Sequence, residues 1–255
     1  MGKIHLVVCS SGAEGAVQRI MLGEPVIGLA STGVNVGPKG KLSLILLTTG
    51  EGDVYAFDVK KYPDLMYQGL GRLLQSVHVL KVVHNSAPLA ANLHFQFGIS
   101  LQNIFDTQVA YSIIMENMGL CGRRVPLAAL CEKCSIEQYA PSPQFQKLLA
   151  EDMNAWARRP LTKEMLNTAA SLVLPLVPSL YGKLMRAIDE KSWEWFQVLN
   201  EENRVSLIRN KRASAQQSSR REATPRTSHQ ELPVFRLSKS QRELLKDTLP
   251  PAART

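Results

Sequence analysis

The pattern of hydrophobic and polar positions is most informative in residues 26–49, VIGLASTGVNVGPKGKLSLILLTT. The two ends of this stretch are β-branched or aliphatic runs of strand length, and three glycines and a proline lie between them. Glycine and proline break helices and supply turn conformations, so the stretch predicts a hairpin. Strands this apolar have to be covered on both faces, which predicts that the hairpin lies at the centre of a sheet.

The segments on either side of the hairpin predict further strands and helices. Residues 4–9 predict a short strand and residues 13–22 a helix, while the alternation in residues 53–58 predicts a third antiparallel strand. A helix follows over residues 65–75, and then strands and helices alternate over residues 80–83, 87–97, 104–105 and 107–115. Such alternation favours parallel pairing. The pattern therefore predicts an α/β fold with a mixed five-stranded sheet, three antiparallel strands and then two parallel ones, flanked by helices.

The C-terminal part of the folded region is predicted to be helical. The expected pieces are residues 126–134, 143–150, 161–174 and 179–199, with Pro175 and Pro178 ending or kinking the third. Beyond residue 210 the composition shifts to Ser, Arg, Gln, Thr and Pro, which predicts disorder over residues 210–233. Residues 238–249 could form a small amphipathic helix with a partner. We therefore divide the chain into a folded domain, residues 1–203, and a basic, largely disordered tail, residues 204–255.

The net charge of +8 is unevenly distributed. From Arg204 onward there are 12 Lys and Arg against 4 Asp and Glu, so the whole excess lies in the tail and residues 1–203 are neutral. A basic tail is most often a solvated segment, although its Lys and Arg could add non-specific affinity for RNA by releasing counterions.

The four cysteines do not resemble a secreted disulfide scaffold, and residues 6–9 are too short for the apolar part of a signal peptide. The longest apolar stretch, residues 169–181, is interrupted by two prolines and is not expected to span a bilayer. These features predict a cytoplasmic protein without a membrane partner.

Several local patterns are explained better by structure than by chemistry. Residues 37–41, GPKGK, lack the residues of a phosphate-binding P-loop, so a hairpin turn is expected there. Cys131 and Cys134 form half a zinc site with no clear fourth ligand. Asp106 stands at a helix start and is expected to be an N-cap. The acids Glu51, Asp53 and Asp58 are expected to mark an exposed sheet edge and not a metal site.

His84 and Asn85 end a predicted parallel strand, where open α/β sheets bind their ligands. Either a structural hydrogen-bonding pair or a pair of RNA contacts would explain them at this stage.

Five segments together resemble the RNase D-like 3′–5′ exonuclease domain, which has an RNase H-like fold. They are VIGLASTGVNVGPKGKL, DVYAFDV, LKVVHN, FQFGISLQNIFDTQVA and RRPLTKEMLNTAA, in the family's order. The resemblance extends over roughly residues 25–184 and is strongest to the animal branch that contains Egalitarian and the exonuclease 3′–5′ domain-containing proteins.

The resemblance implies a site in which four carboxylates hold two Mg²⁺ or Mn²⁺ ions. Here the family's four acid positions fall on Ala30, Thr32, Leu89 and Leu172, and its tyrosine position falls on Thr168. Leucine and alanine supply no oxygen ligand for a hard cation. The expectation is therefore a pseudo-exonuclease with no catalytic residue, no metal site and no cofactor.

The leading hypothesis is an RNA-binding adaptor in a ribonucleoprotein complex, for example in mRNA localisation or piRNA biogenesis, with protein partners and a homodimeric state. The expected RNA contacts are Asn35, Lys39, Lys41, His84, Asn85 and Arg159. One alternative is an active or residual exonuclease on RNA or DNA, which would need Mg²⁺ or Mn²⁺. The other is a purely protein–protein scaffold with residues 238–249 as its docking helix.

Overall fold

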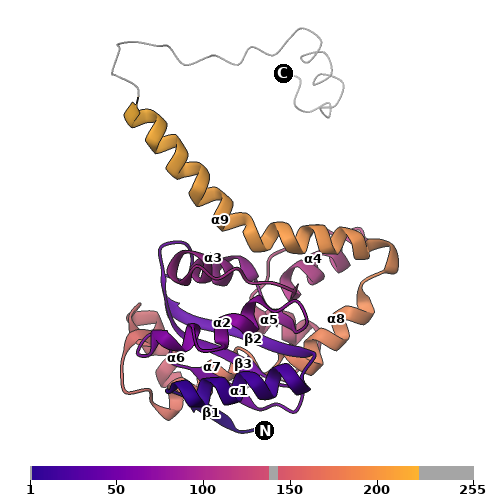
Figure 1. The fold of residues 1–255 in the computed structure, drawn as a ribbon. Helices are drawn as coiled ribbons and strands as arrows, with labels where there is room; N and C mark the ends of the chain where they lie inside the picture. The colour runs from indigo at the N-terminus through magenta and orange to yellow at the C-terminus, as the bar shows by residue number, and fades with distance from the viewer. Residues whose placement is uncertain (1, 138–142, 224–255) are drawn as a thin grey trace, which may run out of the picture. The chain divides into compact units, whose positions relative to one another are not determined.

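The computed structural model describes residues 2–137 and 143–223 of the chain (Figure 1). The strands are β1 (Ile4–Val7), β2 (Val26–Val34), β3 (Lys41–Thr48), β4 (Val54–Phe57), β5 (Leu80–Val83) and β6 (Ile104–Asp106). The longer helices are α1 (Ser10–Gly23), α2 (Leu70–Gln75), α3 (Ser86–Phe97), α4 (Thr107–Asn117), α5 (Leu127–Lys133), α6 (Pro143–Glu151), α7 (Lys163–Ser171), α8 (Tyr181–Ala187) and α9 (Trp193–Ala223). Short helical turns are η1 (Pro63–Met66), η2 (Ala155–Ala157), η3 (Leu176–Leu180) and η4 (Glu190–Ser192).

The sheet has the strand order β1-β4-β3-β2-β5-β6, with the predicted hairpin β2–β3 at its centre. β4 pairs antiparallel with β3, while β5 and β6 continue in parallel from the other side of β2. The predicted mixed α/β fold is confirmed. The number of strands is six and not five, because β1 pairs in parallel with β4 and becomes an edge of the same sheet. The short apolar run of β1 predicts a strand but contains no sign of its partner.

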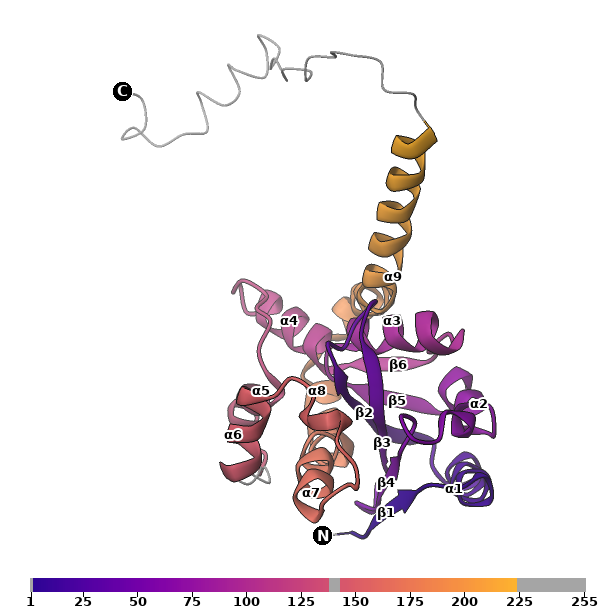
Figure 2. The same cartoon turned by 90° about the vertical axis from the view of Figure 1, so that its left-hand side faces the viewer.

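Helices cover both faces of the sheet (Figure 2). Ile45 and Leu47 of β3 pack into a core cluster with α1, α2 and α3, whereas Leu44 and Leu46 pack into a second cluster with α4, α5, α7, α8 and α9. Successive residues of a strand face opposite sides, so a strand that is apolar at every position needs a helix layer on each face.

Two predicted helices are each divided in the structure. Residues 65–75 separate into η1 and α2, because Gly69 between them has a φ of +107° that a helix does not accommodate. Residues 179–199 separate into η3, α8, η4 and α9, and the side chain of Asp189 accepts a hydrogen bond from the backbone N–H of Lys191 at the intervening turn.

Residues 163–187 are long and apolar enough, by length and composition, to be a candidate membrane span. In the structure this segment consists of α7, η3 and α8, with a non-helical residue at Val177. Half of the most apolar window is buried, and most apolar side chains of the segment, Ala169, Val173 and Leu180 among them, pack in the second core cluster. The segment therefore serves as core helices of the domain in this fold.

The compact unit that contains the sheet extends to Ala215, beyond the predicted boundary at residue 203. Arg204 is buried, and its guanidinium donates a hydrogen bond to the carbonyl of Leu101 at 2.8 Å. The structure also differs from the predicted disorder over residues 210–223, where α9 continues. The remaining tail, including the docking helix expected at residues 238–249, lies outside the described residues.

Candidate functional site: a neutral pocket and a basic groove

A pocket of about 330 Å³ lies beside β2 at the start of α3, and we call it the neutral pocket. Ala30 of β2, Leu89 of α3 and Leu172 at the end of α7 all line it. Its other lining residues are Leu29, Ser31, Val36, Val83, His84, Asn85, Ser86, Pro88, Leu127 and Leu176. Among the described residues, the lining contains no Asp, Glu, Lys or Arg. The structure thus brings three of the four sequence-predicted acid positions together, in a wall that is mostly aliphatic.

The fourth acid position, Thr32, and the tyrosine position, Thr168, are both buried. Thr32 and Thr168 are each 3% exposed, and neither side-chain hydroxyl has a hydrogen-bond partner among the described atoms. A hydroxyl without a partner is costly to bury, so these side chains add polarity but no charge.

His84 is held by the protein through both ring nitrogens. Its Nε2 lies 2.9 Å from the carbonyl oxygen of Val125, which can only accept, so Nε2 carries the proton. Its Nδ1 lies 2.9 Å from the hydroxyl of Thr107. Burial lowers the pKa of His84, while the Val125 contact and the charge of Asp106 oppose the shift. The ring is a neutral structural group, which favours the structural interpretation of this residue.

Asp106 is an N-cap, as predicted, because its side chain accepts a hydrogen bond from the backbone N–H of Gln108. It is fully buried and also accepts from the backbone N–H groups of Asn85 and Ser86 at 2.9 and 2.6 Å, and from the side chain of Asn203 at 2.8 Å. One carboxylate therefore joins the ends of β5 and β6 to α9. It positions Asn85, a residue with positive φ whose buried Oδ1 has no partner among the described atoms.

Asn35, Lys39 and Lys41 lie in a different cavity of about 670 Å³, which we call the basic groove. Lys60, Gln96 and Asn154 supply its other amide and amine groups, and its remaining lining residues are Val34, Leu42, Ser43, Val59, Pro63 and Ala157. Sequence reasoning missed Lys60. Nothing near it in the chain indicates that the segment after β4 lies beside the β2–β3 turn.

Arg159 does not line either cavity, and its guanidinium forms a two-pronged ion pair with Asp58. Nε and Nη2 lie 2.7 and 2.5 Å from the two carboxylate oxygens, and Asp58 is only 2% exposed. The expectation that Asp58 belongs to an exposed sheet edge is therefore wrong. Asp53, in contrast, accepts a hydrogen bond from the backbone N–H of Lys3 and lies 3.7 Å from His5.

The donor set does not fit the two metal ions that the fold family implies. Within residues 2–137 and 143–223, no group of three or more His, Cys, Asp or Glu side chains could hold a metal ion. This applies to the neutral pocket, to the Asp53 region and to Cys131 and Cys134 of the half zinc site. Mg²⁺ and Mn²⁺ need several oxygen ligands, usually including carboxylates, so the described residues support no catalytic step through a metal.

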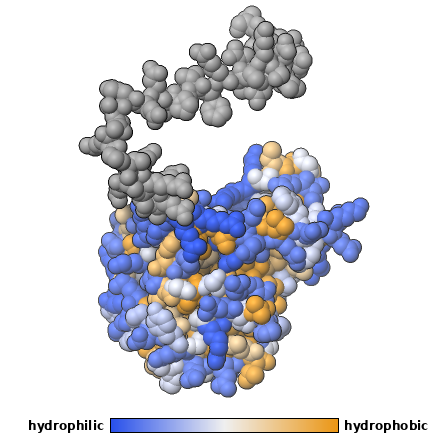
Figure 3. Space-filling model, turned by 45° about the horizontal axis from the view of Figure 1, so that its top comes forward, coloured by the Kyte–Doolittle hydropathy of each residue, from blue (hydrophilic) through white to orange (hydrophobic). Residues whose placement is uncertain are grey.

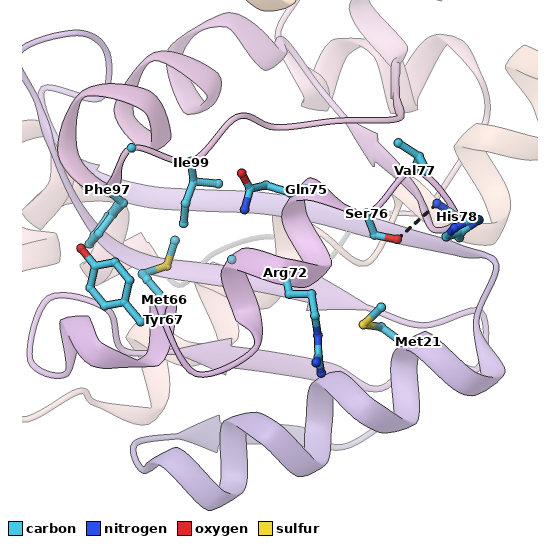
Figure 4. Close-up of a pocket in the computed structure, with 12 residues that line it drawn as sticks. Met21, Met66, Tyr67, Arg72, Gln75, Ser76, Val77, His78, Phe97 and Ile99 are labelled. Carbon is cyan, nitrogen blue, oxygen red and sulfur yellow. Dashed lines mark hydrogen bonds between the residues drawn. The ribbon is translucent and has the colours of Figure 1, made fainter.

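A further cavity of about 680 Å³ lies near α1, α2 and the end of α3 (Figure 4). Met66, Tyr67 and Phe97 gather at one end, while Ser76 and His78 lie at the other, where the backbone N–H of His78 donates to the Ser76 hydroxyl. None of the sequence-predicted site residues lies in this cavity.

Residues 31–189 match the family model described as 3′–5′ exonuclease, so the chain belongs to this family. The structure of Trypanosoma brucei RNase D in complex with RNA U12 has the same fold, with a TM-score of 0.62 and 18% identity over 95% of this chain and 79% of that chain. The predicted RNase D-like resemblance is confirmed.

Two curated relatives are more similar in sequence. The piRNA biogenesis protein EXD1 of Homo sapiens is 30% identical over 171 residues, which are 63% of this chain and 33% of that protein. The Egalitarian protein homolog of Caenorhabditis elegans is 26% identical over 201 residues, 73% of this chain and 34% of that protein. The chain thus spans about a third of the length of these relatives.

Proposed function

We propose that this protein is a catalytically inactive 3′–5′ exonuclease-like domain that binds RNA as an adaptor in a ribonucleoprotein complex. The single observation that carries the proposal is the neutral pocket, in which Ala30, Leu89 and Leu172 occupy positions where the family resemblance expects carboxylates.

The energetic argument concerns what a metal ion would lose on entering this pocket. Aliphatic walls offer nothing to replace its water ligands, and the neutral ring of His84 is already engaged on both nitrogens. Bound metals supply several kcal/mol of transition-state stabilisation in phosphodiester hydrolysis, and about 1.4 kcal/mol corresponds to each factor of ten in rate. Without them, hydrolysis in this pocket is expected to be negligible.

RNA binding is supported from two directions. The basic groove contains three of the residues that were predicted to contact RNA, Asn35, Lys39 and Lys41. One relative is named as a piRNA biogenesis protein and the other as an Egalitarian homolog. The structural neighbour, T. brucei RNase D, binds RNA U12. We extend this to a cytoplasmic role in mRNA localisation or piRNA biogenesis, with protein partners in the complex.

The proposal is tested with end-labelled single-stranded RNA and the full chain. We expect the RNA to keep its length in Mg²⁺ or Mn²⁺, and to form a complex whose affinity falls as salt rises. A ladder of shortened products that EDTA abolishes would restore the exonuclease alternative. Absence of a complex at low salt would remove the RNA role.

A protein–protein scaffold is the second candidate, favoured by large apolar side chains that remain exposed. Met118 and Leu120 follow α4 and Trp195 lies in α9, and they are 68, 52 and 51% exposed. On the face shown in Figure 3, apolar areas are interrupted by polar ones. Sedimentation of the full chain across a range of concentrations tests the proposed homodimer, and a Trp195→Lys variant that dissociates it would assign the surface.

A further inference from the structure

The basic groove carries positive charge that the described protein leaves unbalanced. The part of the chain that the structure describes contributes no Asp or Glu to its lining. Lys39, Lys41 and Lys60 form no ion pair among the described residues, although residues 1–203 carry no net charge overall. Three cations around one concavity repel one another, so an anion that enters the groove gains from all three.

The wall that carries Lys39 is held in place before any ligand binds. Asn92 of α3 is 1% exposed, and its Oδ1 accepts from the backbone N–H of Gly37 at 2.6 Å. Its Nδ2 donates to the carbonyl of Gly40 at 2.9 Å, so the two bonds bracket Lys39. Because the turn is already ordered, binding does not have to supply the free energy of ordering its backbone.

The other wall is fastened as well. The backbone N–H of Lys60 donates to the carbonyl of Ser43 at 3.1 Å, which ties the segment after β4 to β3. The Oε1 of Gln96 accepts from the backbone N–H of Leu42 at 3.0 Å, which leaves its NH₂ group as a donor near the lysines. The groove is therefore a preformed set of amines and amides.

We propose that the basic groove binds the sugar–phosphate backbone of single-stranded RNA, with Lys39, Lys41 and Lys60 each contacting phosphate oxygens. This inference rests on the proposed RNA-binding function and assigns the surface that performs it. The backbone is held in a cavity whose lining residues are distinct from those of the neutral pocket.

The lining selects among anionic ligands. The described lining of the groove contains no aromatic residue and so offers no platform for stacking bases. Recognition of the backbone is therefore expected to be independent of sequence. The lysines border a concavity of about 670 Å³, which a single strand can enter and the flat surface of a bilayer cannot.

The test compares two triple variants of the full chain. Lys39→Gln/Lys41→Gln/Lys60→Gln removes the groove's charge. Lys133→Gln/Lys163→Gln/Lys191→Gln removes the same charge from exposed lysines outside the groove. Circular dichroism and thermal unfolding verify that both are folded. Binding of mixed-sequence single-stranded RNA is then titrated at several salt concentrations.

The groove variant is expected to bind RNA about tenfold or more weakly at low salt, equally for RNAs of different sequence. The slope of log K against log salt should become shallower by about 2, since each phosphate contact on a single strand contributes about 0.7. The control variant should stay close to the unchanged protein.

Four outcomes would overturn the inference. If the groove variant keeps the affinity and salt slope of the unchanged protein, or if the control loses as much, only the groove assignment fails. If the lysines prove necessary for binding vesicles of anionic lipid and not RNA, the ligand class is wrong. If the unchanged protein binds no RNA at all, the proposed function fails together with the inference.

Discussion

Lys81 of β5 is a lysine with no exposed surface and no carboxylate partner among the described residues. Its Nζ donates to the carbonyl oxygens of Ser76 and Val79 at 2.5 and 2.8 Å. Burial lowers the pKa of Lys81 from 10.5 to about 8. The side chain ties the turn before β5 to the sheet, but its charge is destabilising where it lies.

This gives a prediction for the pH dependence of stability. Between pH 8 and 10.5 the unfolded chain holds the Lys81 proton more tightly than the folded chain does, so the contribution of Lys81 to stability rises with pH. The quantity to follow is the stability difference, which is the free energy of unfolding of the unchanged protein minus that of Lys81→Met. This stability difference should increase from pH 8 to 10.5 and stay constant below pH 8. Urea unfolding at a series of pH values measures this difference.

Lys147→Met is the matched control, because it makes the same change of side chain at an exposed lysine. The prediction would be contradicted if the free energies of unfolding of the unchanged protein and of Lys81→Met differed by a constant amount from pH 8 to 10.5.

Residue roles were predictable where the interaction is local in the chain. Asp106 as an N-cap follows from its position beside the helix it caps. The Asp58–Arg159 pair joins residues that are 101 positions apart. The carbonyl partners of Lys81 lie in the turn before β5, and they reach its Nζ only when that turn has its folded conformation. No spacing in the sequence indicates such pairs, because they are created by tertiary packing.

At the scale of elements, the β2–β3 hairpin was predictable because apolar strands and a glycine-rich turn are local signals. The pairing of β1 with β4 and the continuation of α9 were not. The residues of α9 after position 210 have the composition of a disordered segment, yet Lys211 donates to the carbonyl of Pro38 at 2.6 Å and lies 3.9 Å from the ring of Phe95. Tertiary contacts of this kind override a compositional trend.

The β2–β3 turn also gives a prediction. Asn92→Ala removes both bonds that hold the turn around Lys39 without changing any charge. We expect the RNA affinity to fall several-fold while the salt slope is kept, because the lysines remain but their backbone must now be ordered on binding. Amide hydrogen exchange at Gly37 should accelerate, and stability should fall by about 1–3 kcal/mol because buried backbone groups lose their partners.

Asn117→Ala is the control. Asn117, the last residue of α4, accepts a hydrogen bond from the hydroxyl of Ser192 and is not among the residues that line the groove. If Asn92→Ala bound RNA with the affinity of the unchanged protein, an ordered turn would not be required for RNA binding.

The whole molecule combines the intact exonuclease fold with a pocket that has no charged lining residue. The two properties have different physical origins. The fold depends on apolar strands and two helix layers, whereas metal binding depends on a few carboxylates that contribute little to the core. Ala or Leu at such positions avoids charge repulsion and adds apolar contacts, since Ala30 packs against the second core cluster and Leu89 belongs to the first. The fold can therefore be kept without the chemistry.

A restored site tests this account directly. The variant Ala30→Asp/Thr32→Glu/Leu89→Asp/Leu172→Asp would place three carboxylates in the lining of the neutral pocket and a fourth, at position 32, on the same strand as the first. In EDTA these unpaired charges should lower the thermal midpoint well below that of the unchanged protein, because buried carboxylates repel one another and lose hydration. Adding Mn²⁺ should raise the midpoint of the variant, since a ligand that binds only the folded state stabilises it by mass action. The unchanged protein should show no shift with Mn²⁺. A rise of similar size in both proteins would reveal a metal site that does not use these four positions, which would contradict the absence of a metal site among the described residues.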